Sequence, residues 1–373
     1  MTVTRARVAV TAVFFLNGAV FSAWYSRLPA IASDLALSPG ELGLALLGAP
    51  AGLLIAQPLV GATIARRGSR AVLGLMPLLF AAVVLPGIAF DLASLVVALI
   101  VVGAANGALD IAINAQGLVV ERSAPAPLFS SLHAGFSFGA LAGALLAGLI
   151  AALGVAPLPH LAAVAVAGAA IALALESWLL PDRHAADPRA RRLARPSWRL
   201  AALGTIAFCA LLAEGAVFDW SALYLDLEAG ASAGIAPLGL AAFSLTMGIG
   251  RLGTDRALAR WGAARVARAG AGLAAVGIGA ALASAAPAGA IAGFGVMGLG
   301  LAAVFPLTLR AASTPTMLAA VSSVGYLGFL LGPPLIGLAA EAADLRLALV
   351  AVCAACLVAA GLAGRLPADG KHR

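Results

Sequence analysis

The sequence predicts an all-α membrane protein in which twelve transmembrane helices form two pseudo-symmetric six-helix bundles. Its composition, the spacing of its apolar runs and the distribution of its arginines support this fold class. Hydrophobic residues make up 62% of the 373-residue chain and charged residues only 10%, whereas a soluble domain carries about 25% charged residues. So few ionisable side chains cannot cover a water-facing surface, which excludes a soluble globular enzyme.

Apolar runs, each bounded by polar residues, proline or glycine, follow one another along the whole chain. A helix that crosses the hydrocarbon core of a bilayer needs about 20 predominantly apolar residues, and the runs are close to this length. We expect transmembrane helices at residues 8–30, 41–65, 71–90, 94–120, 128–154, 159–180, 200–224, 233–255, 264–286, 289–310, 316–339 and 345–366.

The arginines indicate how these helices are oriented. The chain contains 23 Lys and Arg but only 16 Asp and Glu, and loops on the cytoplasmic side of a membrane are enriched in Lys and Arg. With the N-terminus in the cytoplasm, every Lys and Arg except Arg27 and Arg346 falls on the cytoplasmic side. We therefore expect a multi-pass protein of the bacterial cytoplasmic (inner) membrane with both termini in the cytoplasm. This placement explains the basic balance without nucleic-acid binding.

One stretch rich in arginine and proline, PDRHAADPRARRLARPSWR, separates the sixth and seventh apolar runs. It lacks the apolar periodicity of a helix, so we expect a cytoplasmic linker at residues 182–198. The linker divides the chain into an N-terminal six-helix bundle, residues 1–181, and a C-terminal six-helix bundle, residues 199–373. A self-contained pair of bundles needs no partner subunit, so we expect a monomer.

Short strings recur in equivalent places of the two halves. The sequence GAVF occurs at residues 18–21 in the first run and at residues 215–218 in the seventh. Gly68 and Gly262 both follow arginine-containing segments, after the second and the eighth run, and paired serines occur in the fifth and eleventh runs. Three matches in the same order predict a duplicated six-helix unit.

This organisation, with a glycine- and arginine-rich loop after the second run and again after the eighth, resembles the major facilitator superfamily of secondary transporters. The loop signature of that family is Gly-x-x-x-Asp-Arg-x-Gly-Arg-[Arg/Lys]. The first copy here has Ala65 at the acidic position, and the second keeps Asp255. In the family this loop latches one conformation shut, so the resemblance implies a gating role here. The implied gating residues are Gly61, Arg66, Gly68, Arg70, Arg251, Asp255, Arg256 and Arg260.

Three longer strings resemble one bacterial branch of this family, the YbjJ-type inner-membrane proteins, which are loosely akin to fucose permease. They are NGALDIAINAQG at residues 106–117, SSLHAGFSFG at 130–139 and EGAVFDWSALYL at 214–225. The resemblance implies alternating access, in which the two bundles rock about a site near the middle of the bilayer. The first, fourth, seventh and tenth spans would line that site.

Ionisable side chains inside the predicted spans are costly to bury, so each is a candidate functional group. Asp110 shares one face of the fourth span with Asn106 and Asn114, and Glu214 lies near the middle of the seventh span. His133 lies in the fifth span at a depth similar to that of Asp110, so we expect a hydrogen-bonded, coupled pair, with a lone histidine as the alternative. Because carboxyl and imidazole groups exchange protons, Asp110, Glu214 and His133 are the candidates for proton coupling.

A polar group stands beside aromatic rings on one face of the first span. Asn17, Phe21 and Trp24 share this face, which suits a sugar-like or ring-bearing ligand. Aromatic residues at helical spacing also occur in ordinary packed cores, and this alternative stays open. The candidate substrate-binding residues are Asn17, Phe21, Trp24, Asn106, Asn114 and Phe218.

The predicted interior is acidic. Asp110, Glu214 and Asp219 lie within spans, with pairing to Arg27 as the alternative for Asp219, and Arg251 is expected at an inner helix end. An interior without a central cation suits a neutral or cationic solute. We therefore expect a secondary transporter, a proton-coupled symporter of a small neutral or polyol- or sugar-like solute. The alternative is a proton-coupled antiporter that exports cationic amphiphilic compounds.

Other functional classes fit the sequence less well. Ser130, Ser131 and His133 lie close together, but no nearby group completes a nucleophilic arrangement, so we expect no enzyme activity. A lipid flipper would need a lateral polar track, which the sequence does not reveal. Cys353 and Cys356 lie in an apolar run, where small hydrophobic side chains are the expected role. We expect no cofactor and no metal, with the proton as coupling ion and a small-molecule substrate and the lipid bilayer as binding partners.

Overall fold

The computed structural model describes residues 3–123, 129–182, 197–312 and 314–364, and all regular structure within these residues is helical. The first half contains α1 (Val3–Tyr25), α2 (Leu28–Asp34), α3 (Pro39–Leu46), α4 (Gly48–Arg67), α5 (Ser69–Leu73), α6 (Met76–Ala81), the 3-10 helix η1 (Ala82–Ile88), α7 (Leu92–Arg122), α8 (Phe129–Ala152) and α9 (Pro157–Glu176). The second half contains α10 (Trp198–Leu227), α11 (Leu238–Trp261), α12 (Ala263–Ala283), α13 (Pro287–Leu301), α14 (Val304–Arg310), α15 (Pro315–Ala342) and α16 (Leu345–Ala363).

Within the described residues, ten segments are long and apolar enough to cross a membrane. They are α1 with α2, α3 with α4, α7, α8, α9, α10, α12, α13 with α14, α15 and α16. The other two expected spans are α11, which carries several charged residues towards its C-terminal end, and the segment from α5 to η1, which is broken into short helices. The fold class predicted from the sequence, an all-α membrane protein, is thus confirmed.

Four predicted spans, at residues 8–30, 41–65, 71–90 and 289–310, are divided into shorter helices, and proline explains two of these breaks. The first span, expected as one helix at residues 8–30, ends as α1 at Tyr25 and resumes as α2, which has Pro29 in its first turn. The third span, expected at residues 71–90, is interrupted in the same way before Pro77 of α6. Proline lacks the backbone N–H of a helix interior and restricts the residue before it, so a new helix begins at each of these places.

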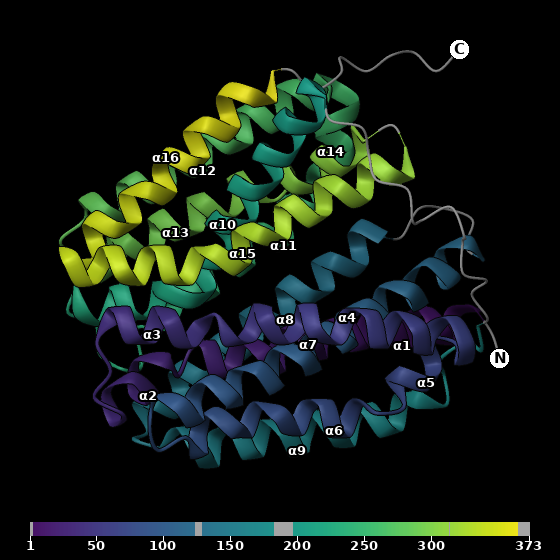
Figure 1. Ribbon diagram of the computed structural model, residues 1–373, viewed down its shortest axis with the longest axis horizontal. Helices are drawn as coiled ribbons and strands as arrows, with labels where there is room; N and C mark the ends of the chain where they lie inside the picture. The colour runs from purple at the N-terminus through teal and green to yellow at the C-terminus, as the bar shows by residue number, and fades with distance from the viewer. Residues whose placement is uncertain (1–2, 124–128, 183–196, 313, 365–373) are drawn as a thin grey trace.

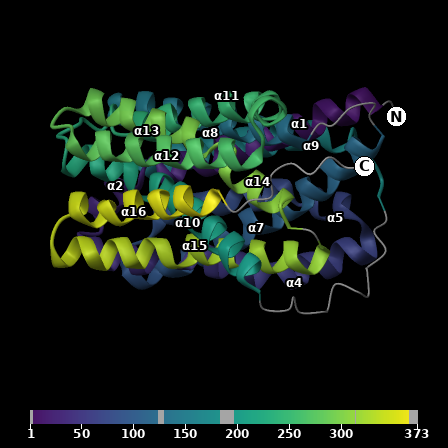
Figure 2. The ribbon, with the colours of Figure 1, turned by 90° about the horizontal axis from the view of Figure 1, so that it is seen from above.

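The helices form two bundles that run along a common axis. Helices α1 to α9 make up one bundle and α10 to α16 the other (Figure 1), and Figure 2 shows the long helices lying roughly parallel to one another. The bundles meet where α8 packs along α11 and where α3 packs against α15. Helix α1 begins and α16 ends at the same end of the molecule, opposite the end where α3 meets α15 (Figure 1).

At the end far from the termini, the two bundles are in direct backbone contact. A Cβ atom added to Gly43 of α3 would lie 2.8 Å from the Cα of Gly337 in α15, and one added to Gly337 would lie 2.6 Å from the carbonyl oxygen of Pro39. Across the same junction, Oε2 of Glu341 accepts a hydrogen bond from the backbone amide of Gly40 at 3.1 Å. The structure is therefore closed at this end, which we call the α3–α15 end.

The duplication predicted from the short repeats is visible in the backbone. Gly68, between α4 and α5, has φ 81° and ψ 164°, and Gly262, between α11 and α12, has φ 79° and ψ 157°. Residues with a side chain rarely adopt positive φ, so glycine is required at both turns. Equivalent loops of the two halves thus turn with nearly the same geometry.

Candidate functional site

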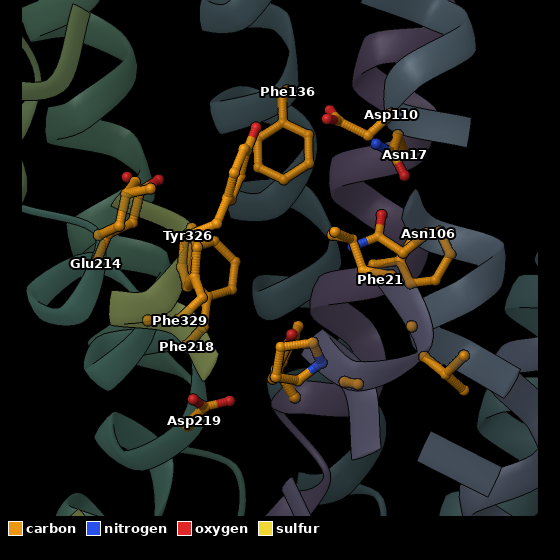
Figure 3. Close-up of a pocket in the computed structure, with 18 of the residues that line it drawn as sticks. Asn17, Phe21, Asn106, Asp110, Phe136, Glu214, Phe218, Asp219, Tyr326 and Phe329 are labelled. Carbon is orange, nitrogen blue, oxygen red and sulfur yellow. The ribbon is translucent and has the colours of Figure 1, made fainter. Parts of the chain in front are cut away.

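A cavity of about 260 Å³ lies between the two bundles, and side chains from both of them line it (Figure 3). The predicted site residues that line it are Asn17, Phe21, Trp24, Asn106, Asp110, His133, Glu214, Phe218 and Arg251. Asn114 is the remaining predicted substrate-binding residue. It does not line the cavity but contacts Asp110 and His133, which do. The structure therefore brings together residues that are far apart in the sequence.

Asp110 and His133 are connected through Asn114. The side-chain amide nitrogen of Asn114 donates to Oδ1 of Asp110 at 3.1 Å and to the Asp110 carbonyl oxygen at 2.8 Å. The amide oxygen of Asn114 lies 3.1 Å from Nε2 of His133 on α8. Because that oxygen can only accept, Nε2 is the protonated nitrogen in this arrangement. The direct pair expected from the sequence is thus a three-residue relay.

Glu214 of α10 forms an ion pair with Arg251 of α11 inside the cavity. Nη2 of Arg251 lies 3.4 Å from Oε1 of Glu214, and both side chains are 14% exposed. Nη1 of Arg251 donates to Oγ of Ser137 at 2.8 Å and to the carbonyl oxygen of His133 at 3.4 Å. Arg251 of the second bundle therefore holds α8 of the first bundle and the central carboxylate of its own bundle.

This position of Arg251 differs from the sequence expectation. From the sequence, Arg251 is expected in a gating loop at an inner helix end, and no cation is expected near the middle of the cavity. Arg251 instead lies in the interior of α11 and lines the cavity. The long arginine side chain can reach several ångströms along the helix from its backbone position, a reach that helical spacing in the sequence does not show.

Two buried amide oxygens on the wall of the first bundle have no hydrogen-bond partner among the residues that the structure describes. They belong to Asn17 of α1 and Asn106 of α7, and the indole N–H of Trp24 is also unpartnered. Figure 3 shows both asparagines on the same side of the pocket. Buried polar atoms are normally hydrogen-bonded, and leaving one unpaired is unfavourable. The two amide oxygens are thus available to hydrogen-bond donors of a solute, and the indole N–H is available to an acceptor.

Aromatic rings form much of the remaining wall. They are Phe14, Phe21, Trp24, Tyr25, Phe136, Phe218, Phe305, Tyr326 and Phe329. The rings of Tyr25 and Phe218 come from opposite bundles and meet edge to face with centroids 5.4 Å apart. Sequence reasoning identified only three of these aromatic residues, because helical spacing shows which residues share a face but not which face meets the other bundle.

Sequence reasoning also left out Asp219 as a site residue. It lines the cavity and is 8% exposed. The alternative of a pair with Arg27 is not what the structure shows, because Nη2 of Arg27 donates to the carbonyl oxygen of Val155. The position of Asp219 only five residues after Glu214 was the available signal, but the two carboxylates lie on different faces of a helix. Both nevertheless line the same cavity.

The first of the two predicted gating loops is held by an acid that comes from elsewhere in the chain. Asp182, which follows α9, accepts hydrogen bonds from the backbone amide of Ser69 at 3.0 Å and from its hydroxyl at 2.9 Å. Gly68 is required here, because a Cβ would lie 2.2 Å from the Asp182 carbonyl oxygen. Asp182 thus supplies a carboxylate to the loop in which Ala65 replaces the acid of the family signature.

The other predicted gating residues lie outside the cavity. Asp255 of the second loop forms an exposed ion pair with Arg310 at 3.7 Å, and the guanidinium of Arg260 lies 5.5 Å from the centre of the Trp261 ring. Gly61 and Arg256 are exposed. Arg66 and Arg70 line a separate pocket of the surface with Glu176 and Asp182 among its other residues. Within the described ranges, no group of three His, Cys, Asp or Glu could hold a metal ion.

Comparison with known proteins identifies the family. The sequence model of the Major Facilitator Superfamily matches residues 10–314. An uncharacterised MFS-type transporter of Yersinia pestis is 33% identical over 358 residues, which cover 92% of this chain and 91% of that protein.

Two solved structures share the fold. The nucleoside transporter NupG superposes with a TM-score of 0.70 at 14% sequence identity, over 98% of this chain and 99% of NupG. A variant of the E. coli fucose:proton symporter FucP gives a TM-score of 0.66 at 17% identity, over 96% of this chain and 98% of FucP. The family consists of transporters that move small molecules across membranes and not of enzymes. The chain thus belongs to the Major Facilitator Superfamily of membrane transporters.

Proposed function

We propose that the chain is a proton-coupled symporter that takes up a small neutral, polyol- or sugar-like solute by alternating access. The observation that carries this proposal is the meeting of Asp110 and Glu214, from opposite bundles, in one cavity. Ionisable groups inside a membrane protein are costly to bury, and those that are present mark transport paths and proton relays. A carboxyl group that faces the same cavity as the solute can bind a proton on one side of the membrane and release it on the other.

The ion pair of Glu214 and Arg251 links proton binding to movement of the bundles. Protonation of Glu214 removes the negative charge that attracts Arg251. Arg251 then keeps only its contacts with Ser137 and the His133 carbonyl on α8. Since α8 and α11 form one of the interfaces between the bundles, the proton changes the contact about which the bundles rock.

The lining of the cavity favours a neutral solute with several hydroxyl groups. The unpartnered oxygens of Asn17 and Asn106 accept hydrogen bonds, and the aromatic rings offer flat apolar surfaces to a ring. The charge of Arg251, the cation of the cavity wall, is compensated by Glu214 at 3.4 Å. An anionic solute would therefore meet two further acids, Asp110 and Asp219, without a free counter-charge.

A second candidate function is proton-coupled antiport that exports cationic amphiphilic compounds. The aromatic wall together with the carboxylate of Asp219 favours it, because aromatic faces and an acid both attract an organic cation. The two candidates predict opposite directions of movement and solutes of different charge. They are separated by the transport experiment described below.

The chain's place within the family and in the cell is part of the same proposal. The strings at residues 106–117, 130–139 and 214–225 support a position in the YbjJ-type branch. The arginine distribution supports a bacterial inner-membrane protein with both termini in the cytoplasm. We also propose a monomer with bundles at residues 1–181 and 199–373 and a linker at residues 182–198, most of which lies outside the described residues.

Transport by purified protein in liposomes tests the proposed function. Vesicles are given an inward or outward pH gradient, and uptake of L-fucose, uridine and tetraphenylphosphonium is measured. We expect a neutral solute to accumulate inside the vesicles when the outside solution, which contains the solute, is the more acidic one. Asp110→Asn and Glu214→Gln should abolish this accumulation while exchange of solute persists, and Asp226→Asn, outside the cavity, should have no effect. Full proton-driven accumulation in both variants would contradict the proposal.

A further inference from the structure

Asp219 is the carboxylate on the cavity wall that has no role in the proposed symport mechanism. It lies on α10, its side chain points towards the cavity (Figure 3), and it is 8% exposed. Among the residues that the structure describes, no hydrogen-bond donor and no cation contacts this carboxylate. By contrast, Asp110 accepts a hydrogen bond from Asn114, and Glu214 forms an ion pair with Arg251.

A carboxylate in this position does not stabilise the fold. Removing it from water is unfavourable, and no ion pair or hydrogen bond compensates the loss. It is also separate from the relay that joins Asp110 to His133, because none of the contacts of that relay includes it. The group that can contact Asp219 must therefore enter from the cavity.

Aromatic rings surround this part of the cavity. The rings of Trp24 and Tyr25 lie with centroids 3.9 Å apart, and Tyr25 meets the ring of Phe218, the residue before Asp219, at 5.4 Å. Tyr25 is also within electrostatic range of Asp219. The Asp219 carboxylate can accept hydrogen bonds from hydroxyl groups on the edge of a solute ring, while the aromatic side chains contact the apolar faces of that ring.

We propose that Asp219 is a specificity-determining residue that accepts hydrogen bonds from hydroxyl groups of the transported solute. The solute class is a neutral ring with hydroxyl groups on more than one side. Figure 3 shows Asn17 and Asn106 on one side of the pocket and Asp219 on the other. The unpartnered amide oxygens would accept from one side of the solute, and Asp219 would accept from the other. A cationic amphiphile has one charged group and few other donors, so it would leave most of these acceptors unpaired. This inference rests on the proposed function, because it assigns a subsite of the same cavity.

The test compares two substitutions of Asp219 with a control on the same helix. Purified full-length protein is screened by thermal shift against hexoses, cyclic polyols, nucleosides and tetraphenylphosphonium. The affinity of the most stabilising solute is then measured for the wild type, Asp219→Asn, Asp219→Ala and Asp226→Asn. Asp226 is half-buried on α10 but does not line the cavity, so its variant controls for the loss of an acid from this helix.

The two substitutions should lower the affinity for a hydroxylated solute by different amounts. The alanine variant loses a hydrogen bond to a charged acceptor, so its affinity should fall about 10- to 100-fold. The asparagine variant keeps a neutral acceptor, so its affinity should fall only about fivefold. Equal and large losses in both variants for tetraphenylphosphonium, without binding of hydroxylated solutes, would overturn the proposal. So would unchanged affinity in Asp219→Ala.

A second measurement needs no solute. Because Asp219 has no partner within the described part of the chain, the melting temperature of the solute-free Asp219→Asn variant should equal or exceed that of the wild type. A clear decrease would show a structural role and overturn the inference. Failure of proton coupling is recognised separately: solute exchange without a pH gradient depends on Asp219 but not on Glu214. Loss of gradient-driven uptake with intact Asp219-dependent binding would thus contradict the proposed coupling alone.

Discussion

Arg251 and Glu214 lie on neighbouring helices of the second bundle, with Nη2 of the arginine 3.4 Å from Oε1 of the glutamate and each side chain 14% exposed. Through its other nitrogen, Arg251 also reaches Ser137 on α8 of the first bundle at 2.8 Å. A buried charge without a partner is far less stable than a buried pair. We therefore expect the charge on Glu214 to determine how firmly Arg251 holds α8 against α11.

Removing one member of this pair should destabilise the protein more than removing both. We expect Arg251→Ala to lower the free energy of unfolding by about 3 kcal/mol, because it leaves Glu214 buried and unpaired. The double variant Arg251→Ala/Glu214→Ala should recover part of this loss. Thermal unfolding in detergent of the wild type, Arg251→Ala, Glu214→Ala and the double variant completes a double-mutant cycle. Additive losses would show that the two side chains do not interact.

The close backbone contact at the α3–α15 end should not tolerate a side chain. A Cβ on Gly337 would lie 2.6 Å from the Pro39 carbonyl oxygen, so Gly337→Val should prevent closure of this end. We expect spin labels across α3 and α15 to report a longer distance and transport to be lost. Gly361→Val is the matched control, since a Cβ at Gly361 meets nothing within 4 Å. An unchanged distance in Gly337→Val would contradict the role of this contact.

Glu341 should favour the closed state of the same end through a single contact. Its Oε2 accepts from the Gly40 amide in the first turn of α3 at 3.1 Å, where a negative charge is also favoured by the helix dipole. We expect Glu341→Gln to shift the equilibrium towards opening by about 0.5 kcal/mol, or roughly twofold. Accessibility of a cysteine placed in the α3–α15 contact measures this shift. The control is Glu41→Gln, because Glu41 caps α3 within its own helix.

The start of α7 should show a defined pH dependence. Oδ1 of Asp91 accepts from the Ser94 amide at 2.7 Å. This hydrogen bond, followed by that of the Ser94 hydroxyl, holds the pKa of Asp91 below its usual value. A depressed folded-state pKa adds stability above the unfolded pKa, and this stability is lost as the pH falls through the folded pKa. Asp91→Ala should therefore lower the melting temperature at pH 7.

This difference between wild type and Asp91→Ala should shrink as the buffer is made acidic. Melting curves recorded over a pH series measure it. Asp91→Asn provides the control, because asparagine also caps helices but carries no titrating charge. A gap of constant size across the series would show that the cap does not depend on the charge of Asp91.

Composition and periodicity determined which parts of this chain span the membrane and how they are duplicated. The bilayer requires apolar runs of spanning length separated by polar or charged loops, so this pattern can be recognised in the sequence. The breaks before Pro29 and Pro77 follow from local backbone chemistry. The glycines of the matching turns, Gly68 and Gly262, occur at equivalent places of the sequence repeat.

The sequence also identified Asp110, Glu214 and Asn106, because polar groups inside an apolar run are conspicuous and costly. It did not identify Asn114 as the residue between Asp110 and His133, nor Arg251 as the partner of Glu214. Both contacts join different helices, and helical periodicity specifies only the faces of one helix at a time.

The sequence by itself thus determined the class of protein, its helices and the acids that lie within them. Only the tertiary structure decided that Asp219 shares a cavity with Glu214 although the two face different sides of α10. It also decided that the aromatic rings of Tyr25 and Phe218 meet across the two bundles. The physical reason is that the bilayer acts on each helix separately, whereas a binding site forms where several helices pack together.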